Sequence, residues 1–434
     1  MLDASAAPHI LDEQGRATIA RVVRRLVPFI FLCYVVAYID RVNIGFASQE
    51  LQRDLNLSDA AYGLGGGLFF LGYCLFEIPS NLILERIGAR LWIARIMAGW
   101  GLVSMAMMFV TGQSSFYAMR IVLGIAEAGF FPGMVLYLTY WIPAAERART
   151  GALFMTAAPV AVLIGAPVSE GLLRLDGWLG LAGWQWLFLV EGFPAVILGV
   201  VALWYLTDGP ERAAWLPAKE REWLSRYMAE ERHARAAQHG GSHLSAILEP
   251  KVFLICLIYF LNTLVTYGVF LWLPRILRDA SGFRDWRLSA ITAIPFAAAL
   301  VGMVLIGRHS DRTRERKRHV AACALVGATG LVLAAMFQHS VAMIVLSFAI
   351  CQVGQRSVQG VFWAIPPMVL GGTAAAAGIA LINSIGNLGG FVGPTVMGWL
   401  RGASGNYSSG LLVLAAALVI EAVLVLSLRL PKRA

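Results

Sequence analysis

Long apolar runs recur along the whole 434-residue chain, and shorter polar segments separate them. Each run holds about twenty residues, enough for a helix to cross a hydrocarbon layer roughly 30 Å thick. Runs of this length favour helices over the strands of a barrel, and a helix satisfies its own backbone hydrogen bonds in lipid. The pattern predicts an all-α membrane protein with twelve spans at 24–46, 59–83, 91–111, 114–141, 150–173, 184–206, 252–276, 287–307, 319–338, 341–369, 374–400 and 408–428.

The longest polar interruption divides the predicted spans into two sets of six. It covers 207–251, and its charged residues over 219–238 recur at mostly helical spacing. Such spacing indicates an amphipathic helix outside the membrane. We therefore predict an N-terminal six-helix half at 1–206, a cytoplasmic linker at 207–251 and a C-terminal six-helix half at 252–434.

The composition and the placement of charge support a membrane location. Hydrophobic residues make up 58% of the chain and charged residues only 14%, too few to cover the surface of a soluble protein of this length. With the N-terminus inside, 24 of the 35 Lys and Arg residues fall on one side and seven on the other. This asymmetry predicts that both termini are cytoplasmic. The net charge of +9 is then a topology signal of a bacterial inner-membrane protein, with no nucleic-acid partner expected.

Four charged residues interrupt two of the apolar runs. Asp40 and Arg41 lie in the first predicted span, and Arg120 and Glu127 lie seven residues apart in the fourth. An ionisable side chain inside a bilayer costs at least a few kcal/mol by insertion scales and persists mainly where it has a partner and a role. The predicted depths allow one buried cluster that moves an anion together with protons. The alternative is a static set of ion pairs that only locks helices together, although buried pairs seldom stabilise more than apolar packing does.

The two predicted halves carry similar polar loops. Glu85-Arg86-Ile87-Gly88-Ala89-Arg90 follows the second span, and Gly307 through Lys317 follows the eighth. Glu85 and Asp311 are 226 residues apart and occupy equivalent places in the two halves. Parallel repeats of six spans are one known transporter architecture.

Several segments resemble a known family of transporters. Gly307 through Lys317 is similar to the loop signature of the major facilitator superfamily, and the first copy departs from it with Asn81 for glycine and Glu85 for aspartate. That variant resembles one branch, the anion:cation symporter family. Further segments that carry this resemblance are Asp40-Arg41-Val42-Asn43, Trp141-Ile142-Pro143, Gly183 through Phe188 and Gly378 through Asn387.

The resemblance implies roles for the residues at matching positions. Asp40 and Glu127 match acids that titrate protons, and Arg41 and Arg120 match cations that tune these acids and hold a substrate carboxylate. Arginine suits this task because its planar fork meets a carboxylate through two hydrogen bonds and stays charged. Four more positions match substrate contacts: Tyr38, Tyr73, Trp363 and Asn383. The two tyrosines could equally be interfacial or core residues, and Asn383 could also only join helices.

The resemblance also implies a cytoplasmic gate built from the two similar loops. Their charges are expected to pair across the interface of the halves, to stabilise the outward-open state, and to separate when the cytoplasmic side opens. The residues of this predicted gate are Glu85, Arg86, Arg90, Asp311, Arg312 and Arg316.

Arg356 stands apart from the family pattern. It lies near the middle of the tenth predicted span, seven residues before Trp363 and hence on the same helix face. If Arg356 faces the cavity, a third cation there indicates a second acidic group on the substrate. If it faces neighbouring helices or backbone carbonyls, its role is structural.

These features predict a monomeric secondary transporter that imports an organic acid anion, such as a tartrate- or phthalate-like dicarboxylate, with protons by alternating access. The alternative is a sugar or organophosphate transporter or exchanger of the same fold. No enzyme activity is expected, because none of the 7 His and 5 Cys falls in a nucleophile–base or metal-ligand arrangement. We expect no metal or cofactor, and the expected partners are the anion, protons and membrane lipid.

Overall fold

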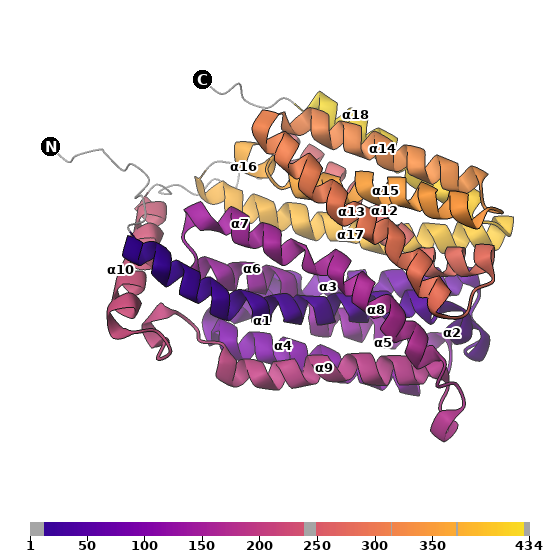
Figure 1. The fold of residues 1–434 in the computed structure, drawn as a ribbon, viewed down its shortest axis with the longest axis horizontal. Coiled ribbons are helices and arrows are strands. Elements are labelled where there is room, and N and C mark those ends of the chain that lie inside the picture. The colour runs from indigo at the N-terminus through magenta and orange to yellow at the C-terminus, as the bar shows by residue number, and fades with distance from the viewer. Residues whose placement is uncertain (1–12, 238–248, 314, 370–371, 429–434) are drawn as a thin grey trace.

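The computed structural model describes residues 13–237, 249–313, 315–369 and 372–428, and these fold into a bundle of helices (Figure 1). Up to the linker the helices are α1 Glu13–Phe46, α2 Ser48–Asp54, α3 Asp59–Ile87, α4 Ala89–Ala106, η1 Met107–Phe109, α5 Gln113–Glu127, α6 Phe130–Trp141, α7 Ala144–Met155, α8 Ala157–Leu173, η2 Trp178–Gly180 and α9 Gly183–Tyr205. From the linker onward they are η3 Pro210–Arg212, α10 Ala218–Ala237, α12 Pro250–Ser281, α13 Trp286–Thr313, α14 Arg316–Met336, α15 Val341–Phe362, α16 Pro366–Val369, α17 Gly372–Ser404 and α18 Ser408–Ser427.

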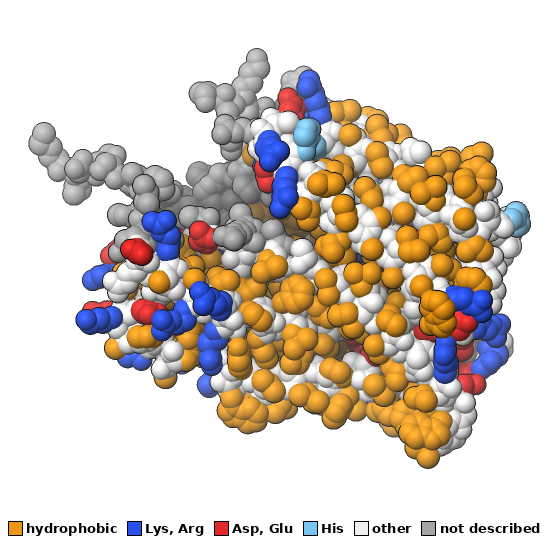
Figure 2. Space-filling model, viewed as in Figure 1, with side chains coloured by type: hydrophobic (Ala, Val, Ile, Leu, Met, Phe, Trp, Pro, Cys, Tyr) orange, Lys and Arg blue, Asp and Glu red, His pale blue; other side chains and the backbone are white. Residues whose placement is uncertain are grey.

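Twelve helical stretches among the described residues are long and apolar enough to cross a membrane. They coincide with the twelve predicted spans, so the prediction of an all-α, twelve-span protein is confirmed. The surface agrees with this arrangement, because large apolar side chains such as Leu75 and Trp204 are 64% and 76% exposed. Figure 2 shows such side chains covering the middle of the visible face, while charged side chains gather at its two ends. A broad apolar surface of this kind suits contact with lipid.

Two ends of the bundle are distinguished below. The terminal end is where α1 begins and where α10 lies, and the distal end is where α2 lies (Figure 1). The predicted cytoplasmic location of the termini remains a prediction, and so do the domain boundaries.

The linker helix α10 packs against the first half at the terminal end. Its Leu224 and Met228 side chains are buried, and its Glu231 accepts a hydrogen bond from the Arg147 guanidinium at 2.6 Å. At the start of the linker, the Asp208 carboxylate accepts a hydrogen bond of 3.0 Å from the backbone N–H of Arg90 in the first turn of α4. A carboxylate is favourable there because the N–H groups of a first helical turn lack partners within the helix.

At the distal end, ion pairs join the two halves, with the carboxylates on the first half and the arginines on the second. Arg278 of α12 pairs with Glu50 of α2 at 2.9 Å and with Glu170 of α8 at 3.3 Å. The Arg278 side chain is only 4% exposed. Further contacts between the halves at this end are Asp59–Arg275, Asp59–Arg401 and Gln49–Asp279.

The fourth span is the clearest departure from the predicted helices. The sequence predicts one helix over 114–141, whereas the structure ends α5 at Glu127 and starts α6 at Phe130. Between them Gly129 has a φ of 84°, and a Cβ at this position would lie 2.3 Å from the Ser80 hydroxyl oxygen. Glycine is therefore required by both the left-handed backbone and the close approach of α3.

Candidate functional site

The centre of the candidate site is an ion pair between α1 and the end of α5. Glu127 is fully buried, and its Oε1 accepts a hydrogen bond from Nε of Arg41 at 2.7 Å and lies 2.5 Å from Nη2 of the same guanidinium. The other oxygen of Glu127, Oε2, has no hydrogen-bond partner among the described residues. The helix break at Ala128–Gly129 follows directly, so the carboxylate lies where an interrupted membrane helix ends. Interrupted helices of this kind surround the ion and substrate sites of several transporters.

Arg120 comes from the same helix, two turns before Glu127, and is 3% exposed. Its Nε and Nη2 donate to the backbone carbonyls of Gly65 and Gly66 on α3 at 3.3 and 3.4 Å, and its guanidinium lies 5.0 Å from the centre of the Phe69 ring. No carboxylate pairs with Arg120 in the part of the chain that the structure describes. The guanidinium therefore has capacity left for an anion.

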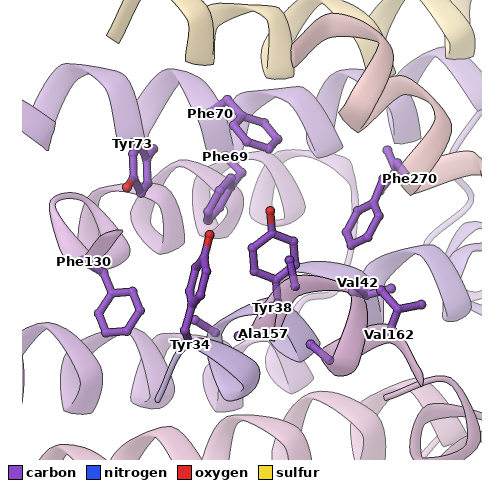
Figure 3. Close-up of a cluster of buried hydrophobic side chains, with 14 of the residues drawn as sticks. Tyr34, Tyr38, Val42, Phe69, Phe70, Tyr73, Phe130, Ala157, Val162 and Phe270 are labelled. Atoms are coloured by element: carbon purple, nitrogen blue, oxygen red, sulfur yellow. The ribbon is translucent and has the colours of Figure 1, made fainter. Parts of the chain in front are cut away.

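Arg41 and Arg120 line the same small cavity, which has a volume of about 20 Å³. That is roughly enough for one water molecule, so in this conformation the cavity is narrow. Figure 3 shows the aromatic rings of Phe69, Phe70 and Phe270 that gather in this region. The other residues that line the cavity are Gly66, Tyr267, Leu271 and Pro394.

Asp40 lies on a different side of α1 from Arg41. Its Oδ1 accepts hydrogen bonds from the Ser104 hydroxyl on α4 and from Nδ2 of Asn43, the latter at 3.1 Å. Oδ2 has no partner among the described residues. Successive residues on a helix point about 100° apart, so Asp40 and Arg41 are directed toward different neighbours. The contacts therefore join Arg41 to Glu127, with Arg120 on the same cavity, and join Asp40 to Ser104 and Asn43 instead.

Tyr38 and Tyr73 both lie beside Arg41. The Arg41 guanidinium is 5.7 Å from the centre of the Tyr38 ring and 5.4 Å from that of Tyr73. Such distances allow cation–π attraction. In Figure 3 the Tyr38 ring lies between those of Phe69 and Phe270. The structure therefore places both predicted tyrosines beside Arg41.

Arg356 is buried, at 3% exposure, and its guanidinium lies near two phenyl rings of the second half. The ring centres of Phe270 and Phe296 are 5.7 and 5.8 Å away. Its one hydrogen bond among the described residues is a long one, 3.5 Å from Nη1 to Oε1 of Gln359. Phe270 also lines the cavity of Arg41, so one ring separates Arg356 from that cavity.

Trp363 and Asn383 occupy other positions in the second half. Trp363 is half-buried at the end of α15, where its ring packs edge-on against Tyr259 at 4.9 Å. Asn383 of α17 donates a hydrogen bond to the buried carboxylate of Glu77 on α3. Neither side chain contacts Arg41 or Arg120 in this conformation.

The sequence analysis missed Tyr267, which is the second-half partner of Arg41. Nη1 of Arg41 donates to the Tyr267 hydroxyl at 3.3 Å, across the interface of the halves. Tyr267 follows Arg41 by 226 residues, the same offset that relates Glu85 to Asp311. Applied to the site as well as to the loops, that offset would have identified Tyr267.

The predicted gate residues lie at the terminal end, mostly exposed. Asp311 pairs with Arg316 at 2.6 Å within the second half, and the Arg316 guanidinium also donates to the Ser310 hydroxyl at 3.0 Å. Among the described residues, no hydrogen bond or ion pair joins a gate residue of one half to a gate residue of the other. The predicted pairing across the halves is therefore not formed in this conformation, in which the distal end is the one joined by ion pairs.

The fold and the buried charged site define a multi-pass membrane protein of the transporter class. A family model described as "Major Facilitator Superfamily" matches residues 30–394 and 288–434. The solved structure of the xylose transporter XylE from E. coli, in an inward open conformation, superposes with a TM-score of 0.76 at 17% identity, covering 95% of this chain and 97% of that one. The chain belongs to the Major Facilitator Superfamily.

Two relatives extend the comparison over nearly the whole length. A protein of Agrobacterium vitis named "Putative tartrate transporter" is 49% identical over 414 residues, which are 94% of this chain and 91% of that protein. The "Inner membrane transport protein RhmT" of Escherichia coli is 38% identical over 407 residues, covering 93% of this chain and 94% of the relative. These matches agree with the predicted resemblance to organic-acid transporters of this superfamily.

Proposed function

We propose that this protein imports an organic acid anion together with protons by alternating access. The observation that carries the proposal is a pair of arginines on one cavity, Arg41 with its side chain 10% exposed and Arg120 buried, of which only Arg41 has a carboxylate partner among the described residues. Burying the Arg120 guanidinium without an ion-pair partner among the described residues is costly, and a bound anion would offset that cost. The name of the Agrobacterium relative supports a tartrate-like carboxylate as the substrate.

Asp40 and Glu127 are the proposed proton carriers. Each keeps one carboxylate oxygen without a hydrogen-bond partner among the described residues. A proton can be held on such an oxygen without breaking an existing contact. When an anion binds to Arg41, it competes with Glu127 for the guanidinium, and the released carboxylate can then take up a proton. This competition links anion binding to proton binding in one step.

The proposal also covers the orientation of the chain, the membrane that holds it and its oligomeric state. The asymmetry of Lys and Arg supports cytoplasmic termini in a bacterial inner membrane, and the name of the E. coli relative supports the same membrane. We propose a monomer, because the described chain itself supplies residues of both halves to the site.

The test is uptake into proteoliposomes of purified protein under an imposed pH gradient. The panel contains tartrate, succinate, phthalate and gluconate, with xylose and glycerol 3-phosphate for the alternative function. We expect a carboxylate to accumulate only while the gradient lasts. Glu127→Gln and Asp40→Asn should abolish accumulation, while exchange or binding stays measurable in at least one of them.

Glu421→Gln is the matched control, since Glu421 is a buried carboxylate hydrogen-bonded to Asn262 at 3.3 Å on the outer helix α18. It should accumulate substrate as the unmodified protein does. Uptake of only the sugar or the phosphate ester would contradict the proposed substrate class. Full accumulation in both acid variants would contradict the proposed proton carriers.

A further inference from the structure

Glu77 is a buried carboxylate between the two halves, and the functional roles above do not use it. It lies on α3 and is 3% exposed. Its Oε1 accepts a hydrogen bond from Nδ2 of Asn383, and its Oε2 accepts from the Ser384 hydroxyl at 3.3 Å and from Nδ2 of Asn387 at 3.4 Å. All three donors belong to α17, so a carboxylate of the first half is held by a polar trio of the second half.

Four other buried carboxylates, those of Asp40, Glu127, Glu191 and Glu421, are bound differently. Glu191 accepts from Ser169 within the first half, and Glu421 from Asn262 within the second. Both retain one oxygen with no partner among the described residues, as Asp40 and Glu127 do. Glu77 alone in this set has both oxygens satisfied, and each amide donates through its nitrogen. An ionised carboxylate, which only accepts, fits such a set of donors.

The trio lies close to the arginine site. Tyr73 is four residues before Glu77 on α3, which is one turn or a rise of about 6 Å, and the Arg41 guanidinium lies 5.4 Å from the Tyr73 ring. An organic acid held at one end by Arg41 would therefore approach the trio with its other end. The trio already presents donors arranged around a carboxylate.

We infer that Asn383, Ser384 and Asn387 form a carboxylate subsite that Glu77 occupies in the empty carrier, and that the incoming organic anion displaces Glu77 from it. The inference rests on the proposed function for the nature of the anion. The Glu77 carboxylate is attached to the chain, so its effective concentration at the trio is high and the apparent affinity for the anion falls accordingly. The same contacts join the halves in the absence of substrate.

The first test is binding of tartrate to the purified protein, measured by calorimetry, with Glu77→Gln as the variant. Glutamine keeps the size of the side chain but removes the charge, and hydrogen bonds between neutral groups are roughly half as strong. We expect the Kd of Glu77→Gln to fall about threefold or more, because less of the subsite is occupied by the competitor. Asn383→Ala should instead raise the Kd, since the subsite itself loses its main donor.

Glu421→Gln is again the control, because it removes a buried carboxylate from an asparagine that lies within one half. Its Kd should equal that of the unmodified protein. An unchanged or raised Kd in Glu77→Gln would overturn the inference. If tartrate fails to bind to the unmodified protein, the strongest binder of the carboxylate panel replaces it.

The second test needs no substrate, so it separates this inference from the proposed function. Cys74 is half-buried on α3, and its thiol donates to the Ser384 carbonyl at 3.3 Å, beside the Glu77 contacts. With the other four cysteines replaced by alanine, we expect a maleimide to label Cys74 at least severalfold faster in Glu77→Gln and in Asn383→Ala. Glu421→Gln should label at the unmodified rate. Equal labelling rates in all variants would show that Glu77 does not hold the halves together and would overturn the inference, whichever carboxylate binds.

Discussion

Replacement of Arg278 by an uncharged glutamine should open the distal end of the transporter. Its Nη1 contacts both carboxylate oxygens of Glu50, at 2.9 and 3.1 Å. Its Nη2 contacts Oε2 of Glu170 at 3.3 Å and the Phe46 carbonyl at 3.2 Å. Arg278→Gln therefore leaves two carboxylates of the first half facing the second half without a cation. In a distal-open conformation water can reach both carboxylates, so the penalty falls mainly on the closed conformation.

The free-energy change caused by Arg278→Gln depends on how deeply Glu50 and Glu170 are buried. Breaking a buried ion pair from one side costs about 3–5 kcal/mol. Glu50 is 24% exposed and Glu170 only 6%, so solvent reduces the loss at Glu50 but hardly at Glu170. We expect about 2–3 kcal/mol against the closed conformation, which shifts the equilibrium roughly 30- to 150-fold toward distal-open.

Double electron–electron resonance measures this shift. Spin labels replace Arg53 of the first half and Arg284 of the second, both exposed at the distal end, in a protein without native cysteines. In the Arg278→Gln variant, the distribution of distances between the two labels should contain a longer distance that is absent when Arg278 is kept. Arg278→Gln combined with Glu170→Gln should reverse part of the effect, because the buried unpaired charge is then gone.

Arg287→Gln is the control at the same end. Arg287 pairs with Asp285 at 2.8 Å, but both belong to the second half and their side chains are 55% and 31% exposed. Such an exposed pair contributes about 0.2–1 kcal/mol and should leave the distances unchanged. Identical distance distributions in Arg278→Gln and the parent would refute the argument that these ion pairs hold the distal end closed.

Three further predictions concern the substrate site and the terminal gate. Arg120→Lys keeps the charge but loses the planar fork, so carboxylate binding should weaken by at least about 1–2 kcal/mol in calorimetry; an unchanged Kd there and in Arg120→Ala would remove Arg120 from the site. If the Phe270 ring moves aside and Arg356 binds a second acidic group, Arg356→Gln should weaken binding of succinate far more than binding of butyrate. Equal losses of affinity for both acids, or no loss for either, would mean that the role of Arg356 is structural. Asp311→Asn should raise the distal-closed population in the spin-label assay, because the gate carboxylate is expected to pair across the halves only when the terminal end closes; an unchanged population with intact transport would leave this loop a topological element.

Much of the architecture and part of the site were predictable from the sequence because they depend on local pattern. Runs of apolar residues determine where helices cross lipid, since each helix satisfies its own backbone. Charged residues inside those runs, above all Arg41, Arg120 and Glu127, stand out because charge is costly in lipid. The interruption of the fourth span was missed, although Gly129 is present in the sequence, because its φ depends on the approach of Ser80 from α3.

Partners between helices could not be predicted in the same way. Asp40 and Arg41 are adjacent in sequence, yet the rotation of α1 within the bundle directs one toward Ser104 and the other toward the cavity. The donors to Glu77 lie on α17, more than 300 residues away in the sequence. The sequence by itself determined which segments lie in the membrane and which of their residues carry charge. Only the packing of the helices decided which charges meet, because contacts between helices depend on rotation, register and conformational state, none of which a local pattern contains.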